Sequence, residues 1–163
     1  MTILAAMDLA SRSVMSVDPW SLYRRDPRDE RAHADAHPLV LEVEDDDALR
    51  GELAEVLRDE RYVVATAGDG AEALAMLRNG LRPSIVLLDL WLPNVDGVTA
   101  LKEMRADKNL RDVPVVVITA AGVVEASVRA RAQAVMRKPL QLGGLIDVVE
   151  KHRLRVPTDG TAL

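Results

Sequence analysis

Short apolar runs alternate with longer segments of helical apolar spacing from Pro38 onward. The runs cover residues 39–43, 61–66, 85–89, 115–118 and 134–137. Runs of this length are typical of buried strands. Because strands that alternate with helices are joined by right-handed crossovers into a parallel sheet, the pattern predicts a doubly wound α/β fold with five strands.

The helical segments are recognised by apolar residues that recur on one face. Such residues mark the first helix (Leu49, Leu53, Val56, Leu57), the third (Val98, Leu101, Met104) and the last (Leu142, Leu145, Ile146, Val149). In the second, Asp69 and Glu72 resemble a capping box that opens a helix over residues 71–78, and Asn79-Gly80 ends it. The fourth, with Val123, Val124 and Val128, has the thinnest pattern.

Residues 1–37 differ from the rest of the chain. Their stretch 24–31 is charged, of mixed sign and poor in apolar periodicity. We expect a flexible extension here, although a partner-binding arm and a later start, at Met7 or Met15, are alternatives. Residues 38–153 form the predicted domain, and residues 154–163 a short polar tail.

Composition narrows the class of protein. The 163 residues, 48% of them hydrophobic, have room for one domain with a real core, and without Phe that core must be aliphatic. The formal charge of -5 argues against direct nucleic-acid binding. No apolar run approaches the roughly 20 residues that span a bilayer. The absence of cysteine is consistent with a cytoplasmic protein.

Polar residues stand at the ends of four predicted strands. Asp89 ends the run 85–89 before a Pro/Asn/Gly turn, and Glu44-Asp45, Thr119 and Lys138 follow three other runs. Open α/β sheets place their chemistry at the carboxyl ends of the strands. Three carboxylates, a hydroxyl and an ammonium at that edge predict a site for a divalent metal and a phosphate.

Each of these residues also has an ordinary structural interpretation. The acidic run 44–47 could be the first turn of a helix, stabilised by the helix dipole, and we prefer that interpretation for Asp46 and Asp47. Asp89 could cap a loop, Thr119 could be a strand residue with high β propensity, and Lys138 a solvated charge. A shared site explains their common placement better than four separate accidents.

In this order and context, Glu44-Asp45, Asp89, Thr119 and Lys138 resemble the site of a two-component response-regulator receiver domain over residues 38–153. The resemblance implies a flavodoxin-like fold with strand order 2-1-3-4-5 and a cis Lys138-Pro139 bond. It implies that Asp89 accepts a phosphoryl group from a histidine kinase or histidine phosphotransfer protein. Thr119 and Lys138 would then contact the phosphoryl oxygens.

The same resemblance implies a Mg²⁺ site. Asp45, Asp89 and the backbone carbonyl of Trp91 would bind the ion, with Glu44 acting through water. Oxygen ligands of this kind suit Mg²⁺, which keeps several waters. Beyond self-catalysed phosphorylation and dephosphorylation, no enzyme activity is expected.

Several positions depart from the receiver pattern. Glu44 replaces the usual aspartate, which the family tolerates. Glu42 stands inside the first strand, where it must be neutralised, paired or displaced towards the edge. Val135 replaces the aromatic residue that usually takes part in the switch. The stretch between Thr119 and Lys138 is shorter than usual, and Gln133-Ala134 replaces a Gly-Ala turn, so we expect a short or mobile fourth helix.

Three function classes follow. With no second domain expected after residue 153, the leading hypothesis is a stand-alone phosphoacceptor that signals by binding an unidentified protein. The alternative is a pseudo-receiver that binds partners without useful phosphorylation. Glu42, Val135 and the short fourth-helix region favour it slightly, but the intact set of acceptor residues weighs more against it. A Mg²⁺-dependent phosphohydrolase is weaker, because Trp91 stands where such enzymes carry a general acid.

Overall fold

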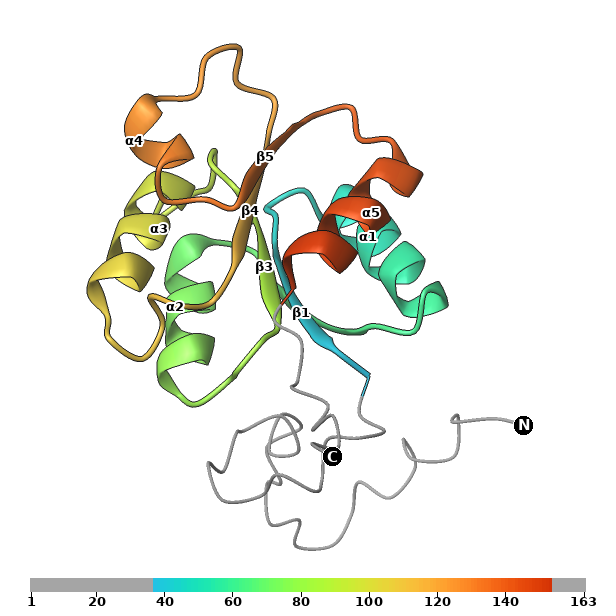
Figure 1. Cartoon of the computed structure of the whole chain (residues 1–163), viewed down its shortest axis with the longest axis horizontal. Coiled ribbons are helices and arrows are strands. Elements are labelled where there is room, and N and C mark those ends of the chain that lie inside the picture. The colour runs from blue at the N-terminus through green and yellow to red at the C-terminus, as the bar shows by residue number, and fades with distance from the viewer. Residues whose placement is uncertain (1–36, 154–163) are drawn as a thin grey trace, which may run out of the picture.

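The computed structural model describes residues 37–153, so the expectations for residues 1–36 and for the tail 154–163 lie outside it. Strands and helices alternate throughout the described chain (Figure 1). In chain order they are β1 (Leu39–Val43), α1 (Asp47–Asp59), β2 (Val63–Ala67), α2 (Gly70–Arg78), β3 (Ile85–Asp89), α3 (Gly97–Ala106), β4 (Val115–Thr119), α4 (Ala126–Arg129), β5 (Ala134–Arg137) and α5 (Leu142–His152).

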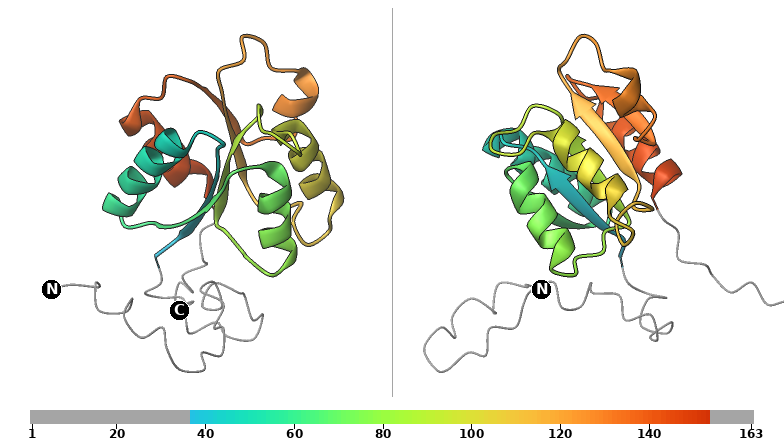
Figure 2. Two further views of the ribbon diagram at one scale, coloured as in Figure 1. Left: turned by 180° about the vertical axis from the view of Figure 1, so that it is seen from behind. Right: turned by 90° about the vertical axis from the view of Figure 1, so that its left-hand side faces the viewer.

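The five strands form one parallel sheet in the order β2-β1-β3-β4-β5, which confirms the predicted fold and strand order. Helices α1 and α5 cover one face, and α2, α3 and α4 cover the other (Figures 1 and 2). Because all strands run the same way, their carboxyl ends meet at a single edge of the sheet.

Aliphatic side chains fill both layers between sheet and helices. All residues of β1, β3 and β4 are buried, as expected for parallel strands covered on both faces. Leu41, Leu88 and Leu101 belong to the layer under α2 and α3, while Val40, Leu57 and Leu145 belong to the layer under α1 and α5. No helix within residues 37–153 has the length and apolar character needed to cross a bilayer.

The second strand begins later than predicted, at Val63 instead of Arg61. Arg61 has a φ of 66° and follows the C-cap Glu60, so it occupies the left-handed position that ends α1. The N–H of Tyr62 bonds to the carbonyl of Leu57 and that of Arg61 to Arg58, which is a Schellman motif. The usual glycine signal is absent at this position, and the sequence pattern therefore missed the helix end.

Helix α2 begins and ends close to the prediction. The Asp69 side chain accepts from the N–H of Glu72, but the Glu72 carboxylate accepts from Gly68, one residue before the expected partner. At the other end Gly80 has a φ of 106°, and its N–H bonds to Leu77, so the predicted Asn79-Gly80 stop is correct.

Helix α4 is short, as predicted, with only four residues. Val124 and Val128 are buried, but Val123 is 88% exposed and does not belong to the apolar face assigned to it. The segment after α4 is held by Arg105 of α3, whose guanidinium donates to the carbonyls of Arg131, Arg111 and Val113.

Gln133, which stands in place of the usual glycine before β5, pairs with Val115 twice. Its N–H donates to the Val115 carbonyl at 2.8 Å, and its side-chain oxygen accepts from the Val115 N–H at 2.7 Å. The side-chain oxygen therefore accepts a hydrogen bond as a backbone carbonyl of a neighbouring strand would. The pairing of β4 with β5 is extended by one position.

Glu42, the fourth of the five residues of β1, is fully buried on the side of α1 and α5. It is 1% exposed, and within the described chain neither carboxyl oxygen has a hydrogen-bond partner. Burial, and then repulsion by Glu44, raises the pKa of Glu42 from 4.5 to about 8, against the weaker attraction of Arg50 and Arg58. Of the three outcomes expected for Glu42, the structure supports neutralisation; the carboxyl group is neither paired nor displaced.

The Glu42 carboxyl group should make stability depend on pH. The pKa of this group is near 4.5 in the unfolded chain and about 8 in the folded chain. Its contribution to the free energy of unfolding is therefore fully present below pH 4.5. Between pH 4.5 and 8 the free energy of unfolding falls by about 1.4 kcal/mol per pH unit. Glu42→Leu should remove this slope and raise the free energy of unfolding at pH 8 by about 2–5 kcal/mol. Urea unfolding between pH 5 and 9 measures both effects.

Glu52 lies in α1, which covers the same face of the sheet as Glu42, and its carboxylate is exposed. It provides the control for this experiment. Glu52→Gln should keep the slope of the parent protein. An unchanged slope in Glu42→Leu would show that Glu42 is not the group that titrates.

Candidate functional site

The predicted site residues converge at the carboxyl edge of the sheet. Glu44 directly follows β1, Asp89 and Thr119 are the last residues of β3 and β4, and Lys138 directly follows β5. The N–H of Lys138 donates to the Thr119 carbonyl, which continues the pairing of β4 and β5 to the site. The sheet thus brings together residues that are up to 94 positions apart in the sequence.

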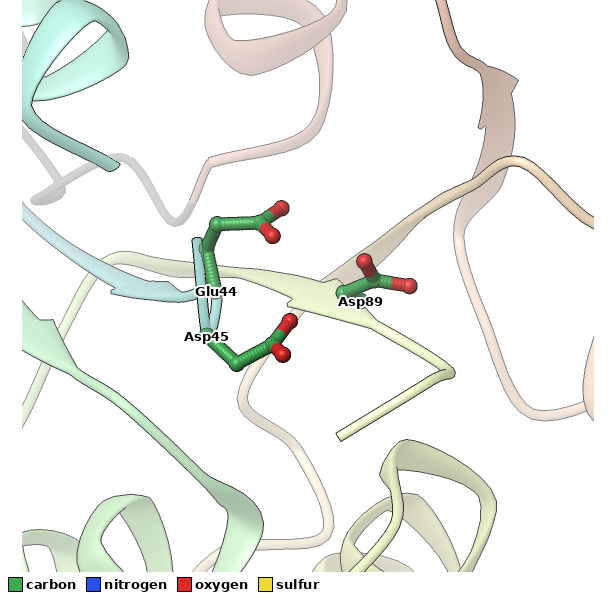
Figure 3. A group of neighbouring side chains, drawn as sticks. All are labelled: Glu44, Asp45 and Asp89. Carbon is green, nitrogen blue, oxygen red and sulfur yellow. The ribbon is translucent and has the colours of Figure 1, made fainter. Parts of the chain in front are cut away.

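Three carboxylates form an acidic cluster. Glu44, Asp45 and Asp89 each place a carboxylate oxygen within 4.8 Å of those of the other two. Figure 3 shows the three carboxylates gathered between the end of β1 and the end of β3. Glu44 and Asp89 are buried, whereas Asp45 is exposed. A cluster of oxygens with one open side fits a hard cation such as Mg²⁺.

Lys138 neutralises the two buried members of this cluster. Its Nζ lies 2.6 Å from Glu44 Oε2 and 2.6 Å from Asp89 Oδ2. Burial by itself lowers the pKa of Lys138, but the hydrogen bonds and charges of Asp89 and Glu44 together outweigh burial and raise it. The ammonium therefore stays charged and binds both carboxylates.

Burial affects the pKa of Glu44 more than the attraction of Lys138 does. Burial raises its pKa, and the hydrogen bond from Lys138 opposes that rise without cancelling it. The backbone at Glu44 is also fixed, because its N–H donates to the Ala67 carbonyl and its carbonyl accepts from Arg50 Nη1. The Glu44 backbone is thus held by Ala67 and Arg50, and its side chain by Lys138.

Thr119 is fully buried beside the cluster. Its Oγ1 accepts a hydrogen bond from the N–H of Ala121 at 3.1 Å. Since that bond uses a lone pair, the hydroxyl proton stays available for an acceptor at the site.

The turn after β3 fixes the position of Asp89. The N–H of Trp91 donates to Asp89 Oδ1 at 3.0 Å, while the other oxygen binds Lys138. Gly97 packs against the backbone of Asp89, and a Cβ there would lie 2.0 Å from the Asp89 carbonyl oxygen. Only a glycine allows α3 to begin this close to the acidic cluster.

The middle of the same turn is bound to the start of α2. Asn94, with a φ of 60°, donates from its side chain to Asp69 Oδ2 at 2.6 Å. The N–H of Gly70 donates to the Val95 carbonyl. The residues that position Asp89 are therefore themselves held by a neighbouring helix.

Sequence reasoning found the residues at the strand ends and missed those that support them. The sequence pattern indicates Gly97 only as part of a turn, and it gives no indication of a role for Arg50. The glycine carried a signal, because it directly precedes a helical segment, but the Arg50 contact depends on tertiary packing. Asp46 caps α1 by accepting from the N–H groups of Ala48 and Leu49, in agreement with its structural interpretation. The Lys138-Pro139 bond is cis, as the resemblance implied.

Comparison with known proteins gives consistent matches. The family model of the response regulator receiver domain matches residues 40–150. The transcriptional regulatory protein PdtaR of Mycobacterium tuberculosis is 37% identical over 115 residues, which are 68% of this chain and 54% of PdtaR. The chain thus spans about half the length of that relative.

Solved structures agree on the fold. The response regulator TrrA of Thermotoga maritima, determined in complex with Mg²⁺-BeF, has a TM-score of 0.64 and 28% identity over 70% of this chain and 97% of its own. The receiver domain of a Pseudomonas aeruginosa sensor histidine kinase, with a magnesium ion coordinated in its active site cleft, has a TM-score of 0.66 and 28% identity over 72% and 98% of the two chains.

The close contact at Gly97 gives a paired test of how the site is positioned. Gly97→Ala should lower the free energy of unfolding by about 1–3 kcal/mol, because the added methyl group displaces the Asp89 backbone. Gly51→Ala is the matched control, since Gly51 lies in α1 with nothing within 4 Å of the added Cβ. The control should gain up to about 1 kcal/mol from helix propensity. Equal effects of the two substitutions in denaturant unfolding would argue against the contact.

Proposed function

We propose, since this chain belongs to the response regulator receiver domain family, that Asp89 accepts a phosphoryl group from a phosphohistidine partner. The observation that carries the proposal is the placement of the Asp89 carboxylate, which belongs to the acidic cluster and contacts the Lys138 ammonium. A nucleophile, a cation-binding set and a positive charge are thus present within one small space. These are the groups that phosphoryl transfer requires.

Asp45, Asp89 and the backbone carbonyl of Trp91 would hold Mg²⁺, with Glu44 acting through water. The fit rests on the mutual approach of the three carboxylates and on their all-oxygen chemistry. When bound, Mg²⁺ supplies positive charge to the equatorial phosphoryl oxygens. Without a cation, the positive charge near Glu44 and Asp89 comes from Lys138.

In the proposed reaction a carboxylate oxygen of Asp89 attacks phosphorus, and the phosphorus–nitrogen bond to the partner's histidine breaks. The electron pair of that bond leaves with the imidazole, and Asp89 becomes an acyl phosphate. Lys138 already touches Asp89 Oδ2, so a small movement brings its ammonium to a phosphoryl oxygen. The hydroxyl group of Thr119, whose oxygen already accepts from Ala121, donates a hydrogen bond to another phosphoryl oxygen.

The partners follow from this chemistry. A histidine kinase or a histidine phosphotransfer protein supplies the phosphoryl group, and an unidentified protein target reads the product. We propose no direct contact with nucleic acid and no enzyme activity beyond self-catalysed phosphorylation and dephosphorylation. A pseudo-receiver of the same fold is the rival, favoured by the buried Glu42 and by Val135, which replaces the usual aromatic residue.

Phosphorylation can be tested directly with Mg²⁺ and a small phosphodonor, followed by intact mass measurement. The parent chain should gain roughly 80 Da, the mass of one phosphoryl group. Asp89→Asn should show no gain, because the nucleophile is lost, and Asp45→Asn should show much less, because a cation ligand is lost. Asp96→Asn is the control, since this nearby carboxylate only caps α3.

The three function classes give different results in that experiment. A stable adduct on Asp89 supports the phosphoacceptor. No adduct in any variant supports the pseudo-receiver, and steady release of phosphate from the donor without an adduct supports the phosphohydrolase. Phosphate on a residue other than Asp89 would contradict the assignment.

The route from Asp89 to a partner must differ from an aromatic switch, because position 135 holds a valine, partly buried against the layer of α2 and α3, and no aromatic side chain. We propose that Ala121 carries the movement instead. Its N–H bonds to Thr119 Oγ1, and its carbonyl accepts from Arg137 Nη1. Through these two bonds, a shift of Thr119 towards a phosphoryl oxygen draws Ala121 with it and orders the segment that follows.

Hydrogen exchange should detect this output. A phosphoryl mimic should increase protection within residues 120–133 and leave α1 nearly unchanged. One hydroxyl contact to a charged group contributes about 1.5–3 kcal/mol, which corresponds to a shift of roughly tenfold to a hundredfold.

Arg137→Met is the matched variant for that measurement, because it removes the bond to Ala121 and keeps the length of the side chain. It should reduce the difference between the two states in residues 120–133 while phosphorylation of Asp89 continues. A response confined to α1 would place the output on another face and contradict the proposal.

A further inference from the structure

A shallow groove lies between the last turn of α1 and the first two turns of α5. Val56, Leu142 and Ile146 supply its apolar part. Leu142 is 49% exposed and is one of only three large hydrophobic residues left exposed within residues 37–153. Apolar surface of this kind, open to solvent on a helix pair, favours a binding site.

The rim of this groove is acidic. Asp59 and Glu60 at the end of α1 and Asp147 in α5 are its charged lining residues, and all three are exposed. Apolar surface bordered by carboxylates fits a segment that carries both apolar and cationic side chains.

The chain contains such a segment in Trp20-Ser21-Leu22-Tyr23-Arg24-Arg25. Its four positions 20–23 hold two of the four aromatic residues of the whole chain, which has two Trp, two Tyr and no Phe. Two arginines follow at once, and the six residues contain no acidic side chain. Composition therefore matches the groove in both apolar and charged character.

The start of the described chain is bound to the strand that follows the α1 side of the groove. The carbonyl of Pro38 accepts from the N–H of Val63 at 3.0 Å, and Val63 is only three positions after the rim residue Glu60. Thirteen positions separate Arg25 from Pro38 (38 − 25), and an extended chain of that length spans up to about 45 Å. The segment can therefore reach the groove of its own domain.

We propose that residues 20–25 bind intramolecularly in the groove between α1 and α5. The aromatic side chains cover Leu142 and Ile146, and the two arginines pair with the acidic rim. The local concentration of a tethered segment favours this arrangement over binding to a second molecule. A partner that needs the α1–α5 surface must then displace the segment, which makes this surface regulated independently of Asp89.

Trp20 fluorescence provides the test in the full-length chain, with Trp91→Phe as background so that Trp20 is the only tryptophan. Bound Trp20 should emit at shorter wavelength and resist quenching by acrylamide. Leu142→Ser, at the exposed apolar position, should shift the emission towards that of free tryptophan and increase quenching.

Charge exchange separates specific binding from general loss of structure. Arg24→Glu with Arg25→Glu should shift the equilibrium towards the free segment by about twofold to thirtyfold, the range for two exposed ion pairs. Adding Asp59→Arg and Asp147→Arg should restore the bound signal. Asp112→Arg with Glu125→Arg, an acidic pair outside the groove, should not restore it.

Three outcomes would overturn the proposal. Trp20 that is fully quenchable in the parent chain shows that the segment is not bound. Restoration by the control pair shows that net charge, and not the groove, is responsible. Protection that rises with protein concentration shows that the occupant is the segment of a second copy of the chain.

Discussion

The Lys138 ammonium between Glu44 and Asp89 is the interaction on which the rest of the site depends. Two carboxylates buried at one sheet edge would repel each other and lose their hydration, and a single cation at 2.6 Å from both offsets these costs. The three residues follow or end β1, β3 and β5, so the ion pairs connect the edge strand β5 to the central strand β3 and to its neighbour β1. Lys138 can therefore neutralise both carboxylates only when the ends of these three strands are aligned.

This arrangement explains why the backbone around the cluster is so closely held. An ammonium can serve two carboxylates only if all three groups keep their positions, and each is fixed by a different element. The close contact with Gly97 positions Asp89. Hydrogen bonds to Arg50 and Ala67 hold the backbone of Glu44. The carbonyl of Thr119 accepts from the N–H of Lys138. The geometry of the cluster is therefore maintained by contacts from the elements around it.

The sequence predicted those parts of the molecule whose causes are local or periodic. Strand positions, the strand order implied by the resemblance and the convergence of Glu44, Asp89, Thr119 and Lys138 follow from apolar runs and from the polar residues that end them. Contacts that depend on two distant segments were not predictable, and the pairing of Gln133 with Val115 is an example. The start of β2 was predicted too early, because the left-handed residue at the end of α1 is Arg61 and not the usual glycine.

The pairing of Gln133 with Val115 has a consequence for how such a domain can diverge. The end of the connection before β5 is fixed by this pairing and by Arg105, while Gly122 at its beginning has open space around it. Insertions near Gly122 would lengthen the connection without disturbing the sheet edge or the acidic cluster. The length of the chain can therefore change at one end of this connection during evolution, while the residues at the strand ends keep their positions.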